Sequence, residues 1–544
     1  RGPGATARKT AARKTAAARP TAPTAPARVD TYVTAEMPRE VRQGGQALVT
    51  VTLSAEQIEA AAAAASAAGR VSLARAPVTV MVLPRQGFDY IGDGSDCEQQ
   101  VEPPTAGAPV VLDFKLLARD TGPGEVMVAL RQGAQRLLTL TLRATVVDAA
   151  ARPTRASTAA SAAAPAGDTP ECGLCPTLEI FDRRGPGSLR YEFILRADGV
   201  NNRYLSAEIK SDPQAYVDAR YTEIESAWTG SQRASDRFNA RLQAIGATMA
   251  RQLFPPELRR ALWKLVEAGA LDDILVYSDE PFLPWEVVFL DDPAAPAATG
   301  HGRFLGELGL CRWLYGAVPT CEIRVRRGGA RYVVPHYPDP QWRLQAAEDD
   351  EEPMLVRELG ATALAPTHEA VLAALSTPGS FDLLHFACHG EADAADIDGA
   401  ALLLQGELLD SGWAKETLLA PVVDQTANLR GADGNRPLVV VNACQTGRIG
   451  YSMSRLGGFA PAFLGAREGE AEATGKAGAF VGALWSVGDF AASTFVHELY
   501  RQLKAGKPMA QAVREGRAMA RSAGEGTWLA YTVYAHPHLR LRFG

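Results

Sequence analysis

The sequence predicts a mixed α/β fold, in which a mainly parallel sheet flanked by helices follows a small all-β, sandwich-like domain. Two patterns lead to this prediction. In the last two thirds of the chain, compact apolar runs alternate with helical periodicity, which is typical of parallel strands buried on both faces. Closer to the N-terminus, short runs alternate apolar and polar residues between Gly and Pro, which is typical of half-buried antiparallel strands.

Length and composition indicate a globular protein of more than one domain. The chain has 544 residues, of which 47% are hydrophobic and 22% are charged. A formal charge of −6 does not favour binding to nucleic acid or to an anionic membrane surface. No apolar stretch has the length of a membrane span, and no signal-peptide pattern opens the chain. The first residue is Arg1 rather than Met, which leaves open whether residues precede it.

Two segments have compositions that cannot bury a core. Residues 1–28 are rich in Ala, Thr, Pro, Arg and Lys, and we interpret them as a disordered basic tail. The tail could touch nucleic acid or an acidic partner, although a solvated leader is the simpler interpretation. Residues 149–171 are rich in Ala, Thr, Ser and Pro and are expected to form a linker.

Residues 29–148 are expected to form the sandwich-like domain. Alternating runs such as Ala47–Leu53 and Val78–Leu83 provide its strands. The Ala-rich segment Ser54–Gly69 is predicted to be an inserted helix, because Ser54 and Gln57 have the spacing of a capping box. No group of His, Cys and acidic residues here could do chemistry, so we expect a docking or sensing role.

The remainder divides into residues 172–330 and residues 331–544, and the second part carries the clearest α/β pattern. The predicted strands are Arg331–Pro335, Phe381–Ala387, Ala401–Leu404, Pro437–Ala443 and Ala479–Trp485. The predicted helices are Glu369–Leu375, Thr494–Ala505 and Met509–Ser522.

The cysteines are few and scattered. Seven in a chain of this length do not form the pattern of a disulfide framework, so a reducing cytoplasm is the expected location. Cys172 and Cys175 have CxxC spacing, but a structural zinc site needs four ligands and no second pair lies nearby in the sequence. We therefore expect ordinary thiols at both positions, with no metal and no cofactor.

Two predicted strands end in residues suited to nucleophilic catalysis. One runs into His389 and Gly390, and the other runs into Cys444. In an open α/β sheet, reacting groups gather beyond the carboxyl ends of the strands. A thiol attacks a carbonyl only as a thiolate, and a histidine can remove its proton and later protonate the leaving amine. Cys388 and His385 lie within or directly after an apolar strand and are interpreted as core residues.

Together, these motifs resemble a known family. The A-C-Q-T-G run at Ala443–Gly447 is close to the caspase nucleophile signature, and the histidine lies 55 positions upstream. With L-P-W-E at Leu283–Glu286, H-F-A-C-H-G at His385–Gly390 and L-W-S-V-G-D at Leu484–Asp489, residues 172–544 resemble a CHAT domain. CHAT domains are a bacterial branch of the caspase-like peptidases related to separase, so the resemblance implies a caspase-like sheet.

The resemblance also implies roles for five residues. His389 would be the base and Cys444 the nucleophile, and the backbone N–H groups of Gly390 and Cys444 would bind the oxyanion. Asp489 would receive a basic side chain of the residue before the scissile bond (P1), beside Trp485 as a second substrate contact. The sequence departs from the family at 467–477, a charged stretch interpreted as a surface insertion or as an activation loop.

The sequence therefore favours a regulated cysteine endopeptidase acting in bacterial defence or signalling. Its substrate would be a protein, and an activating protein could bind the N-terminal domain. A second possibility is a silent caspase-like scaffold that binds a partner, although His389 and Cys444 are both present. A nucleotide-binding protein is disfavoured because no Gly-rich phosphate loop follows an early strand.

Overall fold

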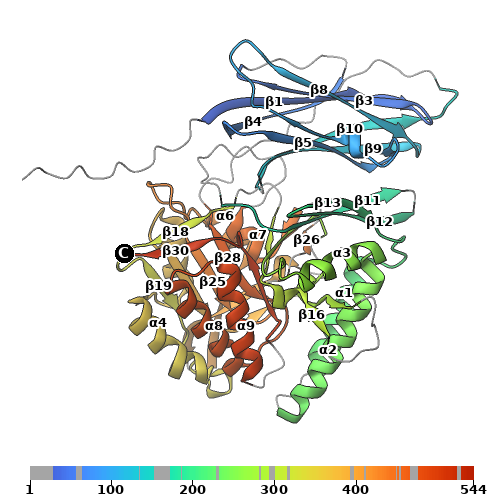
Figure 1. Ribbon diagram of the computed structural model, residues 1–544. Helices are drawn as coiled ribbons and strands as arrows, with labels where there is room; N and C mark the ends of the chain where they lie inside the picture. The colour runs from blue at the N-terminus through green and yellow to red at the C-terminus, as the bar shows by residue number, and fades with distance from the viewer. Residues whose placement is uncertain are drawn as a thin grey trace, which may run out of the picture.

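The computed structural model shows an all-β region stacked against an α/β region (Figure 1). It describes residues 28–56, 64–133, 135–151, 172–185, 187–227, 232–280, 283–292, 301–314, 319–392, 397–409, 412–446, 448, 450–452, 455–465, 476–523 and 528–544. The predicted tail, except for Arg28, most of the predicted linker and most of the 467–477 stretch lie outside the described residues.

The N-terminal region consists of two layers of strands, as the sequence predicts. One layer is a five-stranded sheet in the order β4-β1-β3-β8-β6, and the other runs β2-β10-β9-β5 with β7 paired to β5. A single apolar core fills the space between them. The bounds are β1 Arg28–Pro38, β2 Glu40–Arg42, β3 Gln46–Ser54, β4 Ala64–Ala74, β5 Val78–Gln86, β6 Phe88–Tyr90, β7 Glu98–Val101, β8 Val110–Ala118, β9 Gly122–Gln132 and β10 Gln135–Val147.

The helix predicted over Ser54–Gly69 is wrong where the structure describes it. Residues from Ala64 onward belong to strand β4, which pairs antiparallel with β1 from Pro38↔Ala64 to Arg28↔Ala74. Residues 57–63 lie outside the described residues. Alanine has a strong helix propensity, but a whole strand of backbone partners along β1 outweighs that local preference.

The α/β region is organised by a long sheet whose strands run mainly parallel. From β5 the order continues β11-β14-β17-β29-β28-β25-β21-β19-β20, and only β29 against β28 is antiparallel along the path from β11. The bounds are β11 Thr177–Gly185, β14 Ile274–Ser278, β17 Leu310–Trp313, β19 Ala330–Val333, β20 Thr362–Ala363, β21 Leu383–Ala387, β25 Leu438–Asn442, β28 Ala479–Ala483 and β29 Tyr531–Tyr534.

Shorter strands and nine α-helices among the described residues accompany this sheet. The strands are β12 Ser188–Ala197, β13 Val200–Leu205, β15 Phe289–Asp291, β16 Gly302–Phe304, β18 Glu322–Val325, β22 Gly390–Glu391, β23 Ala401–Leu409, β24 Gly412–Leu419, β26 Gly450–Ser452, β27 Arg455–Gly457 and β30 Arg540–Phe543. The helices are α1 Pro213–Ala227, α2 Gln232–Leu253, α3 Pro256–Glu267, α4 Glu352–Leu359, α5 His368–Ser376, α6 Ala420–Thr426, α7 Phe459–Leu464, α8 Asp489–Lys504 and α9 Met509–Ser522. None of the described helices is long and apolar enough to cross a membrane.

Alternation along the central strands builds a core on each face of the sheet. In β25, Leu438 and Val440 pack on the face covered by α8 and α9, whereas Val439 and Val441 pack on the face covered by α5, α6 and α7. Both faces are buried, so the strand is apolar at each of these four positions. This arrangement confirms the predicted α/β fold with a mainly parallel sheet.

The two regions are joined edge to edge. Strand β11 pairs with β5 at Arg184↔Gln86. The fully buried Glu179 of β11 forms ion pairs with Arg131 of β9 and Arg136 of β10. Burial alone would raise the pKa of Glu179, but these arginines, with Arg196, lower it to about 2. The carboxylate is therefore charged, and its counter-ions come largely from the N-terminal region.

One cysteine expectation is wrong. Cys172 forms a disulfide with Cys321, and their Cα atoms lie 5.0 Å apart. The sequence separation of 149 residues gives no local sign of this pairing. Cys175, the other residue of the CxxC pair, is a buried free thiol.

Candidate active site

The ends of two neighbouring parallel strands bring the candidate catalytic residues together. Strands β21 and β25 pair in register as far as Ala387↔Asn442, so His389 and Cys444 each lie two residues beyond an aligned position. The strand ends also touch, because a Cβ atom placed on Gly390 would lie only 2.6 Å from the carbonyl oxygen of Cys444. Only glycine fits there, which explains the residue directly after the histidine.

The ring of His389 is fixed on one edge. Its Nε2 lies 2.8 Å from the backbone oxygen of Trp342, and its own backbone N–H donates to the hydroxyl of Tyr337 over 3.1 Å. A carbonyl oxygen can only accept a hydrogen bond, so Nε2 carries the hydrogen. In the neutral ring this assignment leaves the lone pair on Nδ1, which is the form a base requires.

Cys444 is half-buried, whereas the other four free cysteines are buried. Burial raises the pKa of the Cys444 thiol above its ordinary value, and hydrogen bonds from the Val487 backbone and the Ser486 side chain offset part of that rise. The negative charge of Glu225 adds to the rise. The resting site therefore holds a thiol rather than a thiolate, and a base is needed to activate it.

The loop after Cys444 is held in an unusual conformation. Gln445 has φ 60°, the left-handed region that L residues seldom occupy, and is the sole non-glycine among the described residues with a positive φ. Its side chain accepts a hydrogen bond from Ala392 N–H and donates one to Glu225, over 3.2 and 3.0 Å. Glu225 also accepts from Arg448 and from the backbone of Ser486. Glu225 of α1 thus forms hydrogen bonds with both the loop at Gln445 and the segment at Ser486, on either side of the thiol.

Asp489 and Trp485 have structural contacts in this state. Asp489 opens α8, and its carboxylate accepts the backbone N–H groups of Ala346 and Ala347 over 2.6 and 3.3 Å. Burial raises the pKa of Asp489. The indole of Trp485 is 1% exposed, with its ring centroid 6.4 Å from that of Tyr221. The substrate contacts expected of both residues stay predictions.

A buried polar network lies beneath the two strand ends. Glu351, which is fully buried, pairs with Nε2 of His385 and accepts both hydrogen bonds donated by the side chain of Asn442. Tyr500 contacts Nδ1 of His385, and Tyr531 donates to the Asn442 side chain. His385 is thus a fully buried histidine in contact with Glu351 and Tyr500, and Cys388 is 3% exposed, so both lie in the core as predicted.

Several residues of this site have no marker in the sequence. Trp342 lies 47 positions from His389, and Glu225 lies 220 positions from Gln445. Ser486 belongs to the L-W-S-V-G-D motif, so the sequence marks its segment. The motif does not predict the hydrogen bond between Ser486 and the thiol. Among the described residues, no group of three His, Cys, Asp or Glu could hold a metal ion.

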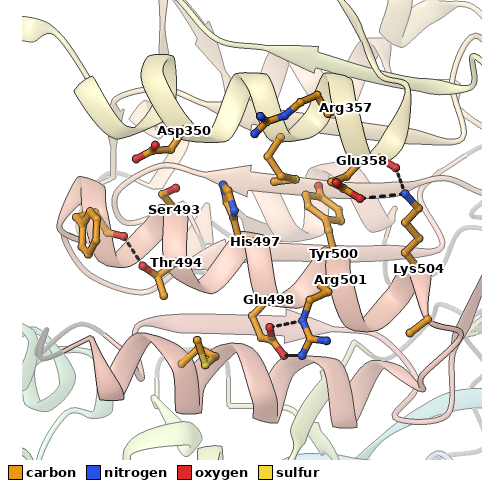
Figure 2. Close-up of a pocket in the computed structure, with 14 residues that line it drawn as sticks. Asp350, Arg357, Glu358, Ser493, Thr494, His497, Glu498, Tyr500, Arg501 and Lys504 are labelled. Atoms are coloured by element: carbon orange, nitrogen blue, oxygen red, sulfur yellow. Dashed lines mark hydrogen bonds and ion pairs between the residues drawn. The ribbon is translucent and has the colours of Figure 1, made fainter.

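The hollow drawn in Figure 2 lies away from these residues. It is a groove of about 740 Å³ between the segment that ends in α4 and helix α8, with Arg357 and His497 on facing elements. None of the five predicted site residues lines it. Tyr500 lies at this groove and also contacts His385, so the groove borders the buried network rather than the thiol.

Replacing Ser486 tests the environment of the thiol. In Ser486→Ala the thiol loses one of the hydrogen bonds that oppose the effect of burial, so the pKa of Cys444 should rise further. Alkylation by iodoacetamide at pH 7.5 should then slow about threefold, as read by intact mass. Ser486→Thr keeps a hydroxyl and serves as the control. An unchanged alkylation profile in Ser486→Ala would show that this hydroxyl does not act on the thiol.

Two known families match the chain, one in the all-β region and one in the α/β region. Residues 243–538 match the CHAT domain, and residues 35–142 match a domain of unknown function (DUF7363). No curated protein matches the chain.

The chain is also similar to solved structures of low sequence identity. Two structures of the Saccharomyces cerevisiae separase–securin complex share 13% and 10% identity, with TM-scores of 0.31 and 0.39. The matches cover 50% and 68% of this chain but only 16% and 30% of the other chains. A complex of the pro- and mature domains of Porphyromonas gingivalis RgpB shares 13% identity at a TM-score of 0.34, over 55% of this chain and 72% of the other.

Proposed function

Because the chain belongs to the CHAT domain family, we propose that it is a cysteine endopeptidase in which His389 and Cys444 form the catalytic dyad. The observation that supports the proposal is the aligned pair of strand ends, because His389 and Cys444 each follow an aligned position by two residues at the same edge of the sheet. The fixed imidazole supports it, since Nε2 is occupied by the Trp342 oxygen and Nδ1 keeps its lone pair.

The reaction follows from these groups. Nδ1 of His389 takes the proton of the Cys444 thiol, and the sulfur attacks the carbonyl carbon of the scissile peptide bond. The backbone N–H groups of Gly390 and Cys444 would stabilise the oxyanion that forms. When the C–N bond breaks, Nδ1–H protonates the leaving amine and a thioester remains. Water, deprotonated by Nδ1, then hydrolyses the thioester and restores the thiol.

Recognition of a basic P1 side chain is assigned to Asp489 in this proposal. A carboxylate offers about four acceptor positions, and the backbone of Ala346 and Ala347 uses two of them. Burial raises the pKa of Asp489, and a protonated His389 would oppose that rise, which supports a position of the carboxylate close to the dyad. Trp485 would line the same pocket, because it lies two residues before Val487, whose backbone donates to the thiol.

The proposal also covers how the enzyme is regulated and in which pathway it acts. The raised pKa of Cys444 supports an enzyme whose activity is low on its own and is increased by a protein partner that acts through the N-terminal region. We place it in a bacterial defence or signalling pathway, with a protein substrate. A cytoplasmic location stays a prediction. The argument for it is that the cysteines are unpaired, but Cys172 and Cys321 form a disulfide.

Covalent labelling tests the proposal. Peptidyl acyloxymethyl ketones with Arg, Lys, Leu or Met at P1 should give one adduct per chain by intact mass, fastest with Arg or Lys. The adduct should be absent in Cys444→Ala and retained in Cys388→Ala, the matched control next to His389. Asp489→Ala should slow labelling by the Arg and Lys probes far more than by the Leu probe.

Two results would contradict the proposal in different ways. A P1 preference that is the same in Asp489→Ala and the wild-type protein would remove Asp489 from the pocket. The absence of any adduct, with the protein folded, would instead favour the scaffold, a protein that binds its partner without cleaving it.

A further inference from the structure

A lysine is held over two indole rings beside the candidate dyad. Trp342 follows β19, and Trp413 belongs to β24; their ring centroids lie 5.9 Å apart at an angle of 68°. The ammonium of Lys415 lies 3.7 Å from the centroid of Trp342 and 5.3 Å from that of Trp413. Both rings are half-buried and Lys415 is exposed. Such cation–π contacts fix an otherwise mobile ammonium in one place.

This indole–lysine cluster, formed by Trp342, Trp413 and Lys415, lies against one edge of the catalytic imidazole. The ring of Trp342 stands at 89° to that of His389, with centroids 5.3 Å apart, and its backbone oxygen holds Nε2. Tyr337 packs between His389 and Trp413, 5.3 and 5.5 Å from the two rings. The cluster therefore borders the Nε2 edge of His389, whereas the proposed mechanism uses Nδ1.

The chemistry of the dyad indicates which part of a substrate would pass this cluster. The base delivers its proton to the leaving amine, which belongs to the first residue after the scissile bond. The chain after the scissile bond must therefore pass beside His389. An extended peptide advances about 3.3 Å per residue, so the first three residues after the bond reach the neighbouring rings and the lysine.

The charge of the cluster indicates which side chain it would bind. Within the side chains that the structure describes, no acidic group pairs with Lys415, and the neighbouring Glu416 accepts the backbone N–H of His368 instead. An exposed ammonium fixed by neutral rings loses little further entropy when an anion binds it. A carboxylate is the group that complements this surface.

We propose that Trp342, Trp413 and Lys415 form a leaving-group-side subsite that binds an Asp or Glu side chain within the first three residues after the scissile bond. The subsite rests on the proposed peptidase function and adds a specificity on the opposite side of the bond from Asp489. Together the two sites would select a basic residue before the bond and an acidic residue after it.

Internally quenched peptides test the subsite. They share one sequence before the scissile bond and carry Glu, Gln or Lys at each of the first three positions after it. At one of these positions the wild-type enzyme should cleave the Glu peptide about 5-fold faster than the Gln peptide in kcat/KM, and the Lys peptide most slowly. Lys415→Gln should abolish this difference, and Lys415→Glu should reverse it.

Matched measurements separate the subsite from the chemistry. Acyloxymethyl ketones carry no residue after the reacting carbonyl, so they should label the wild-type enzyme and both Lys415 variants at equal rates. Lys507→Gln, an exposed lysine on another surface, should keep the wild-type order of the peptides. Trp413→Leu should weaken the Glu preference, because the ammonium loses one of its supporting rings.

Each failure has a distinct meaning. If Lys415→Glu is labelled normally and cleaves the three peptides in the wild-type order, the subsite is overturned and the peptidase function stands. If the wild-type protein is neither labelled nor active, the proposed function is overturned, and the subsite with it.

Discussion

Peptide cleavage should fall by about four orders of magnitude or more in both Cys444→Ala and His389→Gln, with the folded protein intact. The alanine removes the only sulfur that the site offers to a substrate. Glutamine at position 389 can still donate a hydrogen bond to the Trp342 oxygen but cannot take a proton. The double variant should be no worse than the worse of the single variants, because the two groups act in one step.

The measurement is kcat/KM on the best peptide, together with a thermal melting curve for each variant. His336→Gln serves as the histidine control, because His336 is exposed and pairs with Glu352 at the surface. It should keep both turnover and melting temperature. Wild-type turnover in His389→Gln would show that another group acts as the base.

The free energy of unfolding should fall by about 3–5 kcal/mol in Glu351→Leu. Glu351 is fully buried, and its carboxylate forms an ion-pair contact with His385 and accepts hydrogen bonds from the side chain of Asn442. Leucine fills similar space but leaves both donors without an acceptor, away from water. Since Asn442 precedes Cys444 by two residues, the fraction that still folds should also lose activity.

Urea unfolding measures this loss, and two further variants give it a scale. Glu351→Gln keeps one acceptor oxygen and should cost clearly less than Glu351→Leu. Glu358→Gln breaks an exposed pair with Lys504 and should change the unfolding free energy by less than about 1 kcal/mol. A wild-type midpoint in Glu351→Leu would contradict the role of the buried network.

The sequence predicted those parts of the fold that periodicity determines. The buried strands around His389 and Cys444 are apolar at consecutive positions, so their ends could be located to within a residue or two. Helix α9, Met509–Ser522, matches its predicted bounds, because its apolar positions repeat at helical spacing. The adjacency of His389 and Cys444 then follows from the parallel order of β21 and β25.

The parts that could not be predicted depend on contacts between distant segments. The strand β4 replaces a predicted helix because β1 supplies its backbone partners, which no local propensity encodes. Glu351, Trp342 and Glu225 reach the site from three separate loops or helices, and nothing beside them in the sequence marks a functional role. The disulfide from Cys172 to Cys321 likewise spans too much chain to be inferred.

The junction between β5 and β11 predicts what happens when the N-terminal region is removed. A chain cut before residue 172 would keep Glu179 but lose Arg131 and Arg136, so a buried charge would lack most of its counter-ions. It would also leave the backbone of Arg184 without the pairing that β5 provides. The N-terminal region therefore supplies counter-ions to a buried strand that lies between the two family matches in sequence. Any other domain attached in its place would have to offer positive charge opposite Glu179.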